Sequence, residues 1–156
     1  MLDAAVDIQM VTDFSKLPSK LQQLLQYWQG KRKPGHIPSR KDIDPIEIPR
    51  LMPDVALVDV LRDPLDYRYR LAGTNMVEMT GYDRTGMRMR EFFTPEAIAA
   101  TEILIARLIE TREPIAFEGK MFWIEENYRR FQAIVLPLAT DGRTVDMAIM
   151  GLNVIA

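Results

Sequence analysis

The last forty or so residues constrain the fold most, because they hold three long runs of strand-forming residues separated by short connections. The runs cover 114–124, 128–138 and 145–155, and the turn Thr-Asp-Gly-Arg at 140–143 precedes the last run. Strands joined this closely must lie next to one another, so we expect an antiparallel meander. A meander can form one wall of a small-molecule pocket, and the upstream chain must then supply the other wall.

Composition narrows the class of protein. A chain of 156 residues with 47% hydrophobic content is one domain by length and buries about 70% of its unfolded surface. The formal charge of -2 does not favour nucleic-acid binding. Because the chain has no cysteine and a single histidine, His36, disulfides, thiolate or histidine-cluster metal sites and a cysteine nucleophile are excluded.

The N-terminus does not resemble a targeting segment. Its first fourteen residues carry acidic side chains where a secretory signal needs basic ones, and no apolar run approaches the roughly 18 residues of a membrane span. We therefore expect a cytoplasmic protein with no membrane partner. The first dozen or so residues show no periodic pattern and are interpreted as a loosely held lead-in.

An amphipathic helix is predicted over 17–30, with Pro18 in its first turn and Gly30 at its exit. Its apolar stripe consists of Leu17, Leu21, Leu24, Leu25 and Trp28. A stripe of this kind favours packing on its own domain, and contact with a second subunit is the alternative; both can hold at once.

A basic loop at 31–41 (KRKPGHIPSRK) follows. We interpret it as a solvated run of charges. The alternative is that it binds a nucleotide phosphate or an acidic partner. Downstream, Asp42, Asp44 and Glu47 could be imagined as a metal or acid/base cluster. Helix capping explains Asp44 and Glu47 more simply, so we assign them to structure.

The middle of the chain predicts a β-hairpin and then helices. Runs at 54–61 and 67–72 form the hairpin. Alternation places Tyr67, Tyr69 and Leu71 on one face and Arg68 and Arg70 on the other. Short helical pieces fill 73–90, and a long helix runs from Pro95 to about Thr111. The resulting class is α+β, a five-stranded antiparallel sheet with helices over one face and a gap beneath them.

The order of these elements resembles a PAS domain from about residue 54 to 155. The residues at the joints are Gly81-Tyr82, Pro95 at the helix start, Pro137-Leu138 and Asp141-Gly142. A more specific set is similar to the bacterial PAS_5 family of stand-alone PAS proteins. It comprises Tyr27-Trp28 and the stretches at 38–45 (PSRKDIDP), 51–53 (LMP), 69–74 (YRLAGT) and 81–86 (GYDRTG).

The resemblance implies a strand order of 2-1-5-4-3, with the last strand beside the first. It also implies two parts, a helix and basic-loop extension over 1–53 and a PAS core over 54–156. Pro137 would then fall in an interior strand, where it removes a ladder hydrogen bond, so we place it at the strand end or a bulge beside the hairpin.

The residue composition limits which PAS cofactors this chain can hold. Covalent flavin photochemistry needs a cysteine, which the chain lacks. Haem is not expected, because PAS haem sites usually take an axial histidine on or near the long helix and His36 lies before the first strand. The cofactor is otherwise unknown, and a methionine ligand stays open.

Candidate ligand-binding residues surround the expected gap. Arg70 is included because its guanidinium can meet a phosphate or carboxylate, although an ion-paired sheet face is the favoured alternative. The high count of 10 methionines suits an adaptable pocket, and a filled core without a cavity is the alternative. Strand parity is open, so Phe122 and Ile124 are alternatives to Met121 and Trp123. The candidates are Tyr69, Arg70, Asn75, Met76, Met79, Phe92, Phe93, Phe117, Trp123 and Phe131.

These observations predict a non-enzymatic sensory or regulatory module. It would bind a small molecule, a partner protein or both, signal through another chain, and form a homodimer through the N-terminal helix and the outer sheet face. Two alternatives remain: an interaction scaffold with a filled core, and a small enzyme of the α+β cone type using Asp, Arg and Tyr. A buried carboxyl group with a raised pKa beside an Arg or Tyr would favour the enzyme.

Overall fold

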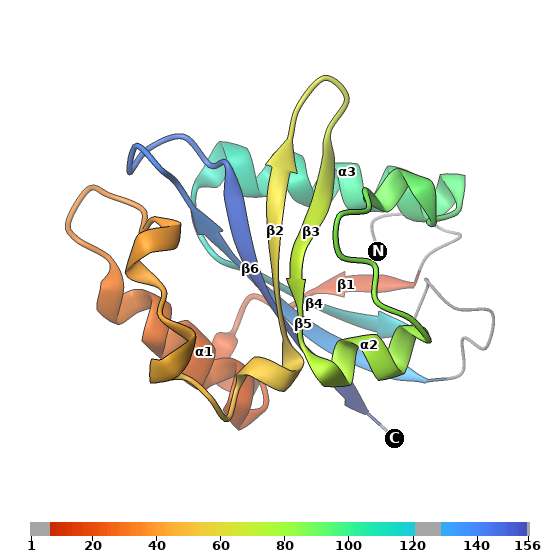
Figure 1. The fold of residues 1–156 in the computed structure, drawn as a ribbon, viewed down its shortest axis with the longest axis horizontal. Coiled ribbons are helices and arrows are strands. Elements are labelled where there is room, and N and C mark those ends of the chain that lie inside the picture. The colour runs from red at the N-terminus through yellow and green to blue at the C-terminus, as the bar shows by residue number, and fades with distance from the viewer. Residues whose placement is uncertain (1–6, 121–128, 156) are drawn as a thin grey trace.

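A six-stranded antiparallel sheet forms the centre of the molecule in the computed structural model, which describes residues 7–120 and 129–155 (Figure 1). The strands are arranged in the order β1-β4-β5-β6-β2-β3. They are β1 (Ile8–Met10), β2 (Val55–Leu61), β3 (Asp66–Ala72), β4 (Ile115–Lys120), β5 (Arg130–Leu138) and β6 (Met147–Ile155). The α+β class is confirmed, and the five predicted strands lie in the predicted order.

The closing strand lies beside the opening one, as predicted, with Ala148 of β6 opposite Val58 of β2. This pairing joins the β2-β3 hairpin to the β4-β5-β6 meander. Within each of those two units, strands that are consecutive in the sequence are neighbours in the sheet, so the internal order was predictable. The β6-β2 contact between them spans most of the chain and completes the sheet.

The sixth strand, β1, corrects the expectation of a loosely held N-terminus. Ile8 is fully buried and pairs with Gly119 on the free edge of β4. An unpaired strand edge is a template for another strand, and Gly119 lets it approach, because a Cβ there would collide with the carbonyl oxygen of Asp7. A strand of three residues has too short a pattern to be predicted from periodicity.

Helices cover both faces of the sheet. In Figure 1, α1 (Ser19–Lys31) lies to the left of the sheet and α2 (Thr74–Thr80) to the right. The long helix α3 (Pro95–Thr111) shares the α2 side and has the predicted bounds, with the Thr94 hydroxyl accepting from the Ala97 N–H at its start. None of the helices in the described ranges has the length and apolar character to cross a membrane. Single-turn 3-10 helices occur at Phe14–Lys16, Arg40–Asp42, Pro45–Glu47, Met52–Asp54 and Met89–Glu91.

The apolar stripe of α1 packs on its own sheet, which confirms the favoured interpretation. A Cβ on Gly151 of β6 would meet Leu21 and Leu24 of α1, so the helix sits directly on the backbone. Residues 38–53 then lead from the end of α1 back to β2. Whether residues 1–53 form a separate extension stays a prediction.

Pro137 lies near the end of β5, as predicted. Pairing between β4 and β5 stops at Ile115 and Val135, so Pro137 lies beyond the end of β4. The missing N–H therefore breaks no bond to β4. The carbonyl oxygen of Pro137 accepts a hydrogen bond of 2.8 Å from the Trp28 indole N–H.

The strict alternation predicted for β3 fails at one position. Leu57 pairs with Leu71 but Val58 pairs with Tyr69, so Arg70 is an extra residue in β3. A bulge of this kind shifts the faces of the residues beyond it. Leu71 is accordingly 36% exposed instead of continuing the buried face of Tyr67.

Candidate functional site

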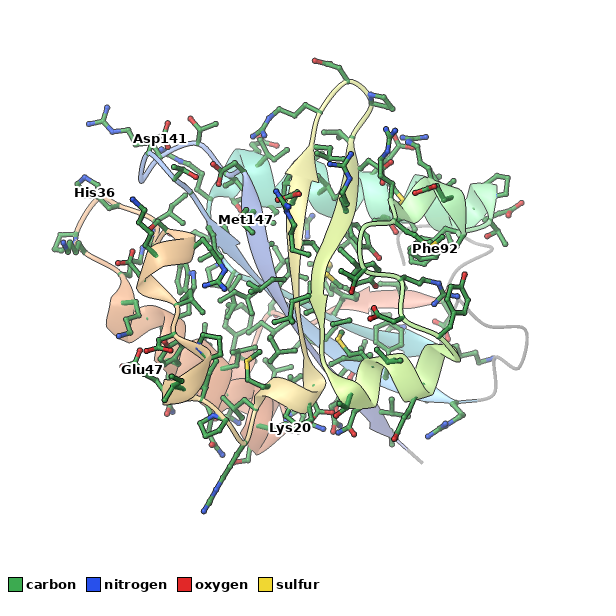
Figure 2. All side chains as sticks on the ribbon, viewed as in Figure 1. Lys20, His36, Glu47, Phe92, Asp141 and Met147 are labelled. Carbon is green, nitrogen blue, oxygen red and sulfur yellow. The ribbon has the colours of Figure 1, made fainter. Side chains whose placement is uncertain are left out.

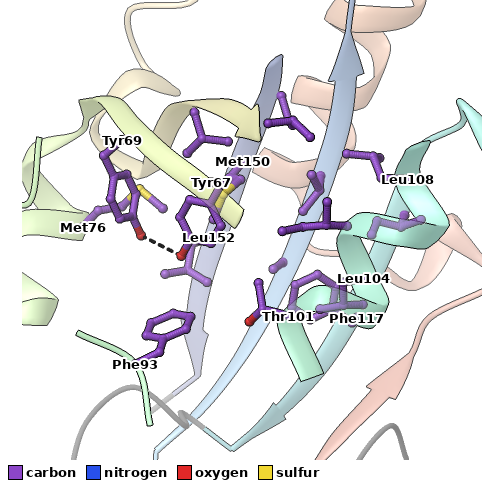
Figure 3. A pocket seen from close by; sticks show the side chains of 18 of the residues that line it. Tyr67, Tyr69, Met76, Phe93, Thr101, Leu104, Leu108, Phe117, Met150 and Leu152 are labelled. Atoms are coloured by element: carbon purple, nitrogen blue, oxygen red, sulfur yellow. Dashed lines mark hydrogen bonds between the residues drawn. The ribbon is translucent and has the colours of Figure 1, made fainter. Parts of the chain in front are cut away.

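A cavity of about 110 Å³ lies between the sheet and the helices α2 and α3 (Figure 3). Five strands contribute to its wall, and α3 closes it with Leu104 and Leu108. Most protein interiors contain few voids larger than a water molecule. An apolar cavity of roughly 150 Å³ is known to take up benzene, so this space is on the scale of a single small ring.

Small side chains on the central strands leave this space open. Ala133 of β5 and Ala148 of β6 both line the cavity. The inward residues of β6 are Ala148, Met150 and Leu152, so Met147 has the opposite parity. Since side chains alternate along a strand, the neighbours Ile134 and Ile149 face α1.

Seven of the ten predicted residues line the cavity. They are Tyr69, Met76, Met79, Phe92, Phe93, Phe117 and Phe131. Trp123 and Met121, and their alternatives Phe122 and Ile124, lie outside the described residues. That the seven bind a ligand stays a prediction.

Arg70 and Asn75 lie outside the cavity. The Arg70 guanidinium is largely exposed, and its Nε is 2.7 Å from Oδ2 of Asp59, which is the ion-paired sheet face given above as the alternative. The Asn75 amide donates a 3.0 Å hydrogen bond to Oδ1 of Asp54 and lines a separate polar pocket with Lys20 and Glu78. The bulge at Arg70 and the position of Asn75 in the first turn of α2 account for both displacements.

Aromatic rings form one wall of the cavity. Tyr67 meets Tyr69 edge to face at 5.3 Å between ring centroids, and Phe92 meets Phe93 in the same way at 4.9 Å. Phe92 also stacks on Tyr69 at 6.1 Å. Interlocking rings of this kind hold one another in place, so the wall has a defined shape.

Two phenol hydroxyl groups lie at this aromatic wall. The hydroxyl oxygens of Tyr67 and Tyr69 lie 3.4 Å apart and point toward one another (Figure 3). Burial raises the pKa of Tyr69 and raises that of Tyr67 well above its usual range, so both hydroxyls are protonated near neutral pH. On the opposite side, the Thr101 hydroxyl donates to the Ala97 carbonyl within α3.

Sequence reasoning missed Arg84 as a cavity residue. It belongs to the turn after α2 and lines the cavity beside the tyrosines. Its guanidinium carbon lies 4.4 Å from the Tyr82 ring centroid and 4.5 Å from that of Phe92. The 81–86 segment was noted as part of the family pattern, but no periodicity indicates where a turn side chain points.

The basic loop is partly ion-paired within the molecule. Arg32 makes a two-pronged contact with Glu113 at 2.7 and 2.8 Å. Lys31 and the Tyr27 hydroxyl both contact the Glu47 carboxylate. These contacts lower the pKa of Glu113 and of Glu47. Figure 2 shows Glu47 and His36 on the α1 side of the molecule, with Phe92 on the other side.

The capping prediction holds for Asp44 and is wrong for Glu47. Asp44 accepts a hydrogen bond from the Ile46 N–H. Glu47 ties its turn to α1 instead, through Tyr27 and Lys31. In the described part of the chain, no three His, Cys, Asp or Glu side chains gather as a metal-binding group.

The six-stranded sheet, the long helix across it and the cavity between them define a PAS-type domain. The chain belongs to the PAS_5 family of PAS domains, whose model matches residues 16–153. The match begins before α1, so that helix belongs to the family pattern. A comparison with curated proteins gave no match.

The chain is similar to several solved structures. A LOV protein of Rhodobacter sphaeroides is similar with a TM-score of 0.51 at 14% identity, over 73% of this chain and 69% of that one. A sensory box histidine kinase/response regulator from Burkholderia thailandensis E264 gives 0.45 at 11% identity, over 72% and 85%. A fungal LOV domain photoreceptor gives 0.46 at 17% identity, over 75% and 95%. At 14% identity the likeness to the Rhodobacter sphaeroides protein concerns the fold alone.

Proposed function

We propose that this PAS domain is a sensory or regulatory module that binds a small molecule in the cavity and passes the change to a partner protein. PAS domains are in general modules of this class. The single observation that carries the proposal is the apolar cavity of about 110 Å³ under α3. A void of this size removes packing contacts from its walls, and an occupant of matching size would restore them.

The sheet supplies a short route from the cavity to the molecular surface. Leu152 and Ala133 line the cavity and pair with one another, whereas the next pair along, Ile134 and Gly151, faces α1. A ligand that alters the spacing of β5 and β6 therefore acts on α1 through one layer of backbone. The partner would read a shift of α1 or of the exposed sheet edge.

The two alternatives have less support. An interaction scaffold with a filled core does not account for the cavity. A cone-type enzyme calls for a carboxyl group in the pocket, and the described residues of the cavity wall include neither a carboxylate nor a histidine. The buried carboxylate Asp66 contacts Arg90 and is not part of that wall.

The predicted homodimer has to use a different side of α1. Its apolar stripe is buried against the sheet, so Leu24→Asp would unfold the chain instead of separating subunits. The exposed side of α1 carries Gln23, Gln26 and Gln29. A dimer through this side predicts that Gln26→Arg halves the mass measured by light scattering, with the circular dichroism spectrum unchanged; a monomeric wild type would contradict the dimer.

Cavity-filling variants test ligand binding. Ala133→Leu and Thr101→Leu fill the space from opposite walls, and Ala106→Leu adds the same side chain on the exposed side of α3. We expect toluene to raise the Tm of the wild type and of Ala106→Leu with increasing concentration, because it binds the folded state. Both filled variants should lose this shift.

Equal shifts in all four proteins would place toluene elsewhere and contradict the proposal. So would the absence of a shift in every one of them. Native mass spectrometry of protein purified from its own host supplies an independent readout, in which retained small-molecule mass should disappear in Ala133→Leu but persist in Ala106→Leu.

A further inference from the structure

Arg84 is a half-buried cation at the edge of an apolar space. It lines the main cavity and also a smaller pocket of about 20 Å³, which it shares with Tyr69, Met76 and Tyr82. Tyr82 is 49% exposed, so Arg84 stands between the cavity and the surface. Its Nε atom is buried and has no hydrogen-bond acceptor among the residues that the structure describes.

Arg84 lacks the carboxylate partner that two other half-buried arginines have. Arg32 is paired with Glu113, and Arg90 contacts Asp66 and Glu102. No carboxylate among the described residues pairs with Arg84, which lies between two ring faces instead. Ring faces attract a cation but do not accept the directed N–H bonds of a guanidinium. Because arginine stays charged at any physiological pH, the positive charge is permanent.

Two further donors lie beside this charge. Arg84 shares a pocket with Tyr69, and Phe92 stacks on both. The 3.4 Å contact between the Tyr67 and Tyr69 hydroxyls is long for an O–H···O bond. Both hydroxyls are therefore available to donate to an oxygen placed near them. One end of the cavity thus combines a guanidinium with two phenols. The rest of the described wall is apolar apart from the Thr101 hydroxyl, which is hydrogen-bonded within α3.

We propose that the ligand of this cavity is a small planar ring that carries one carboxylate, with Arg84 as its counter-ion and Tyr67 and Tyr69 as further donors. This inference rests on the proposed function. A carboxylate matches the paired N–H groups of arginine, and the apolar wall takes the ring. A phosphate ester would bring a second negative charge, for which the described wall holds no second cation.

Fluorine NMR titrations with three probes of similar size test the inference: para-fluorobenzoate, para-fluorobenzamide and fluorobenzene. The variant is Arg84→Gln. The matched control is Arg70→Gln, which removes the same charge from an arginine outside the cavity. Fluorobenzene reports whether the cavity itself survives in each variant, and circular dichroism reports the fold.

We expect the wild type and Arg70→Gln to bind para-fluorobenzoate about tenfold more tightly than the amide, and Arg84→Gln to lose that preference. Fluorobenzene should bind all three proteins alike. If the amide or fluorobenzene matches the benzoate in the wild type, or if Arg84→Gln keeps the preference, the carboxylate inference is overturned and the cavity function stands. If none of the three probes binds the wild type, both fall.

Discussion

The indole of Trp28 donates a 2.8 Å hydrogen bond to the carbonyl oxygen of Pro137, 109 positions further along the chain. This bond fastens α1 to the end of β5, at the point where β4 no longer pairs. Arg32 lies over the same indole at 5.0 Å and is held in turn by Glu113, just before β4. A buried aromatic side chain thus fixes α1 on the outer face of the sheet.

Trp28→Phe should keep most of the packing and lose this hydrogen bond. We expect a loss of about 1–3 kcal/mol in the free energy of unfolding, because the Pro137 carbonyl is left without its buried donor. Urea unfolding followed by circular dichroism measures it. Gln26→Ala, at an exposed position of the same helix, should change stability by less than about 0.5 kcal/mol; equal losses in both would contradict the role of the bond.

Arg90→Met should destabilise the fold through Asp66. The Asp66 side chain is 1% exposed, and Arg90 Nε lies 3.5 Å from its Oδ2. Removing one partner of a buried pair costs about 3 kcal/mol, since the other charge stays buried. The double variant Asp66→Asn/Arg90→Met should recover part of the loss, as measured by chemical unfolding. Arg88→Met, at the exposed neighbouring arginine, is the control and should be nearly neutral.

Leu104→Ala should enlarge the cavity from the α3 side. Leu104 is 6% exposed and lines the cavity, so its truncation should cost about 2–5 kcal/mol. Excess toluene should restore part of that stability by binding the folded state. The control is Ile103→Ala, at a residue that is 45% exposed. A toluene effect as large in that variant would show that the enlarged space is not the binding site.

Tyr67→Phe should make the protein less sensitive to alkaline pH. Burial raises the folded-state pKa of Tyr67 well above the usual value near 10. A raised folded-state pKa contributes stability that is fully present below about pH 10 and is lost as the pH rises toward the folded value. Wild-type stability should therefore fall more steeply above pH 10 than that of the variant. Tyr82→Phe, which alters a half-exposed ring, should keep the wild-type slope.

Local signals were sufficient for the hairpin, the meander and α3. Thr94 and Pro95 are a typical helix start, and the helix begins there. The 140–143 turn joins β5 to β6, and pairing runs from Leu138 opposite Met147 outward. These elements depend on neighbours within a few residues, so a short stretch of sequence contains their causes.

The aromatic and methionine residues of the candidate site could be predicted from the sequence, but the arginine that lines it could not. Apolar residues such as Phe93 and Phe117 must be buried somewhere, and the fold brings both to the cavity. Arginines satisfy their charge in many ways, so Arg70 and Arg84 look alike in sequence. A one-residue bulge places Arg70 beside Asp59, and a turn places Arg84 beside the tyrosines.

By itself the sequence determined the class of fold, the order of its elements and the apolar residues available for the core. These follow from periodicity, turn residues and the pairing of consecutive strands. Only the tertiary structure decided that β1 adds to the edge of β4, that α1 takes the outer face, and that Arg84 lines the same cavity as Tyr67 and Tyr69. Those outcomes arise from contacts between segments far apart in the chain, whose energies no local pattern contains.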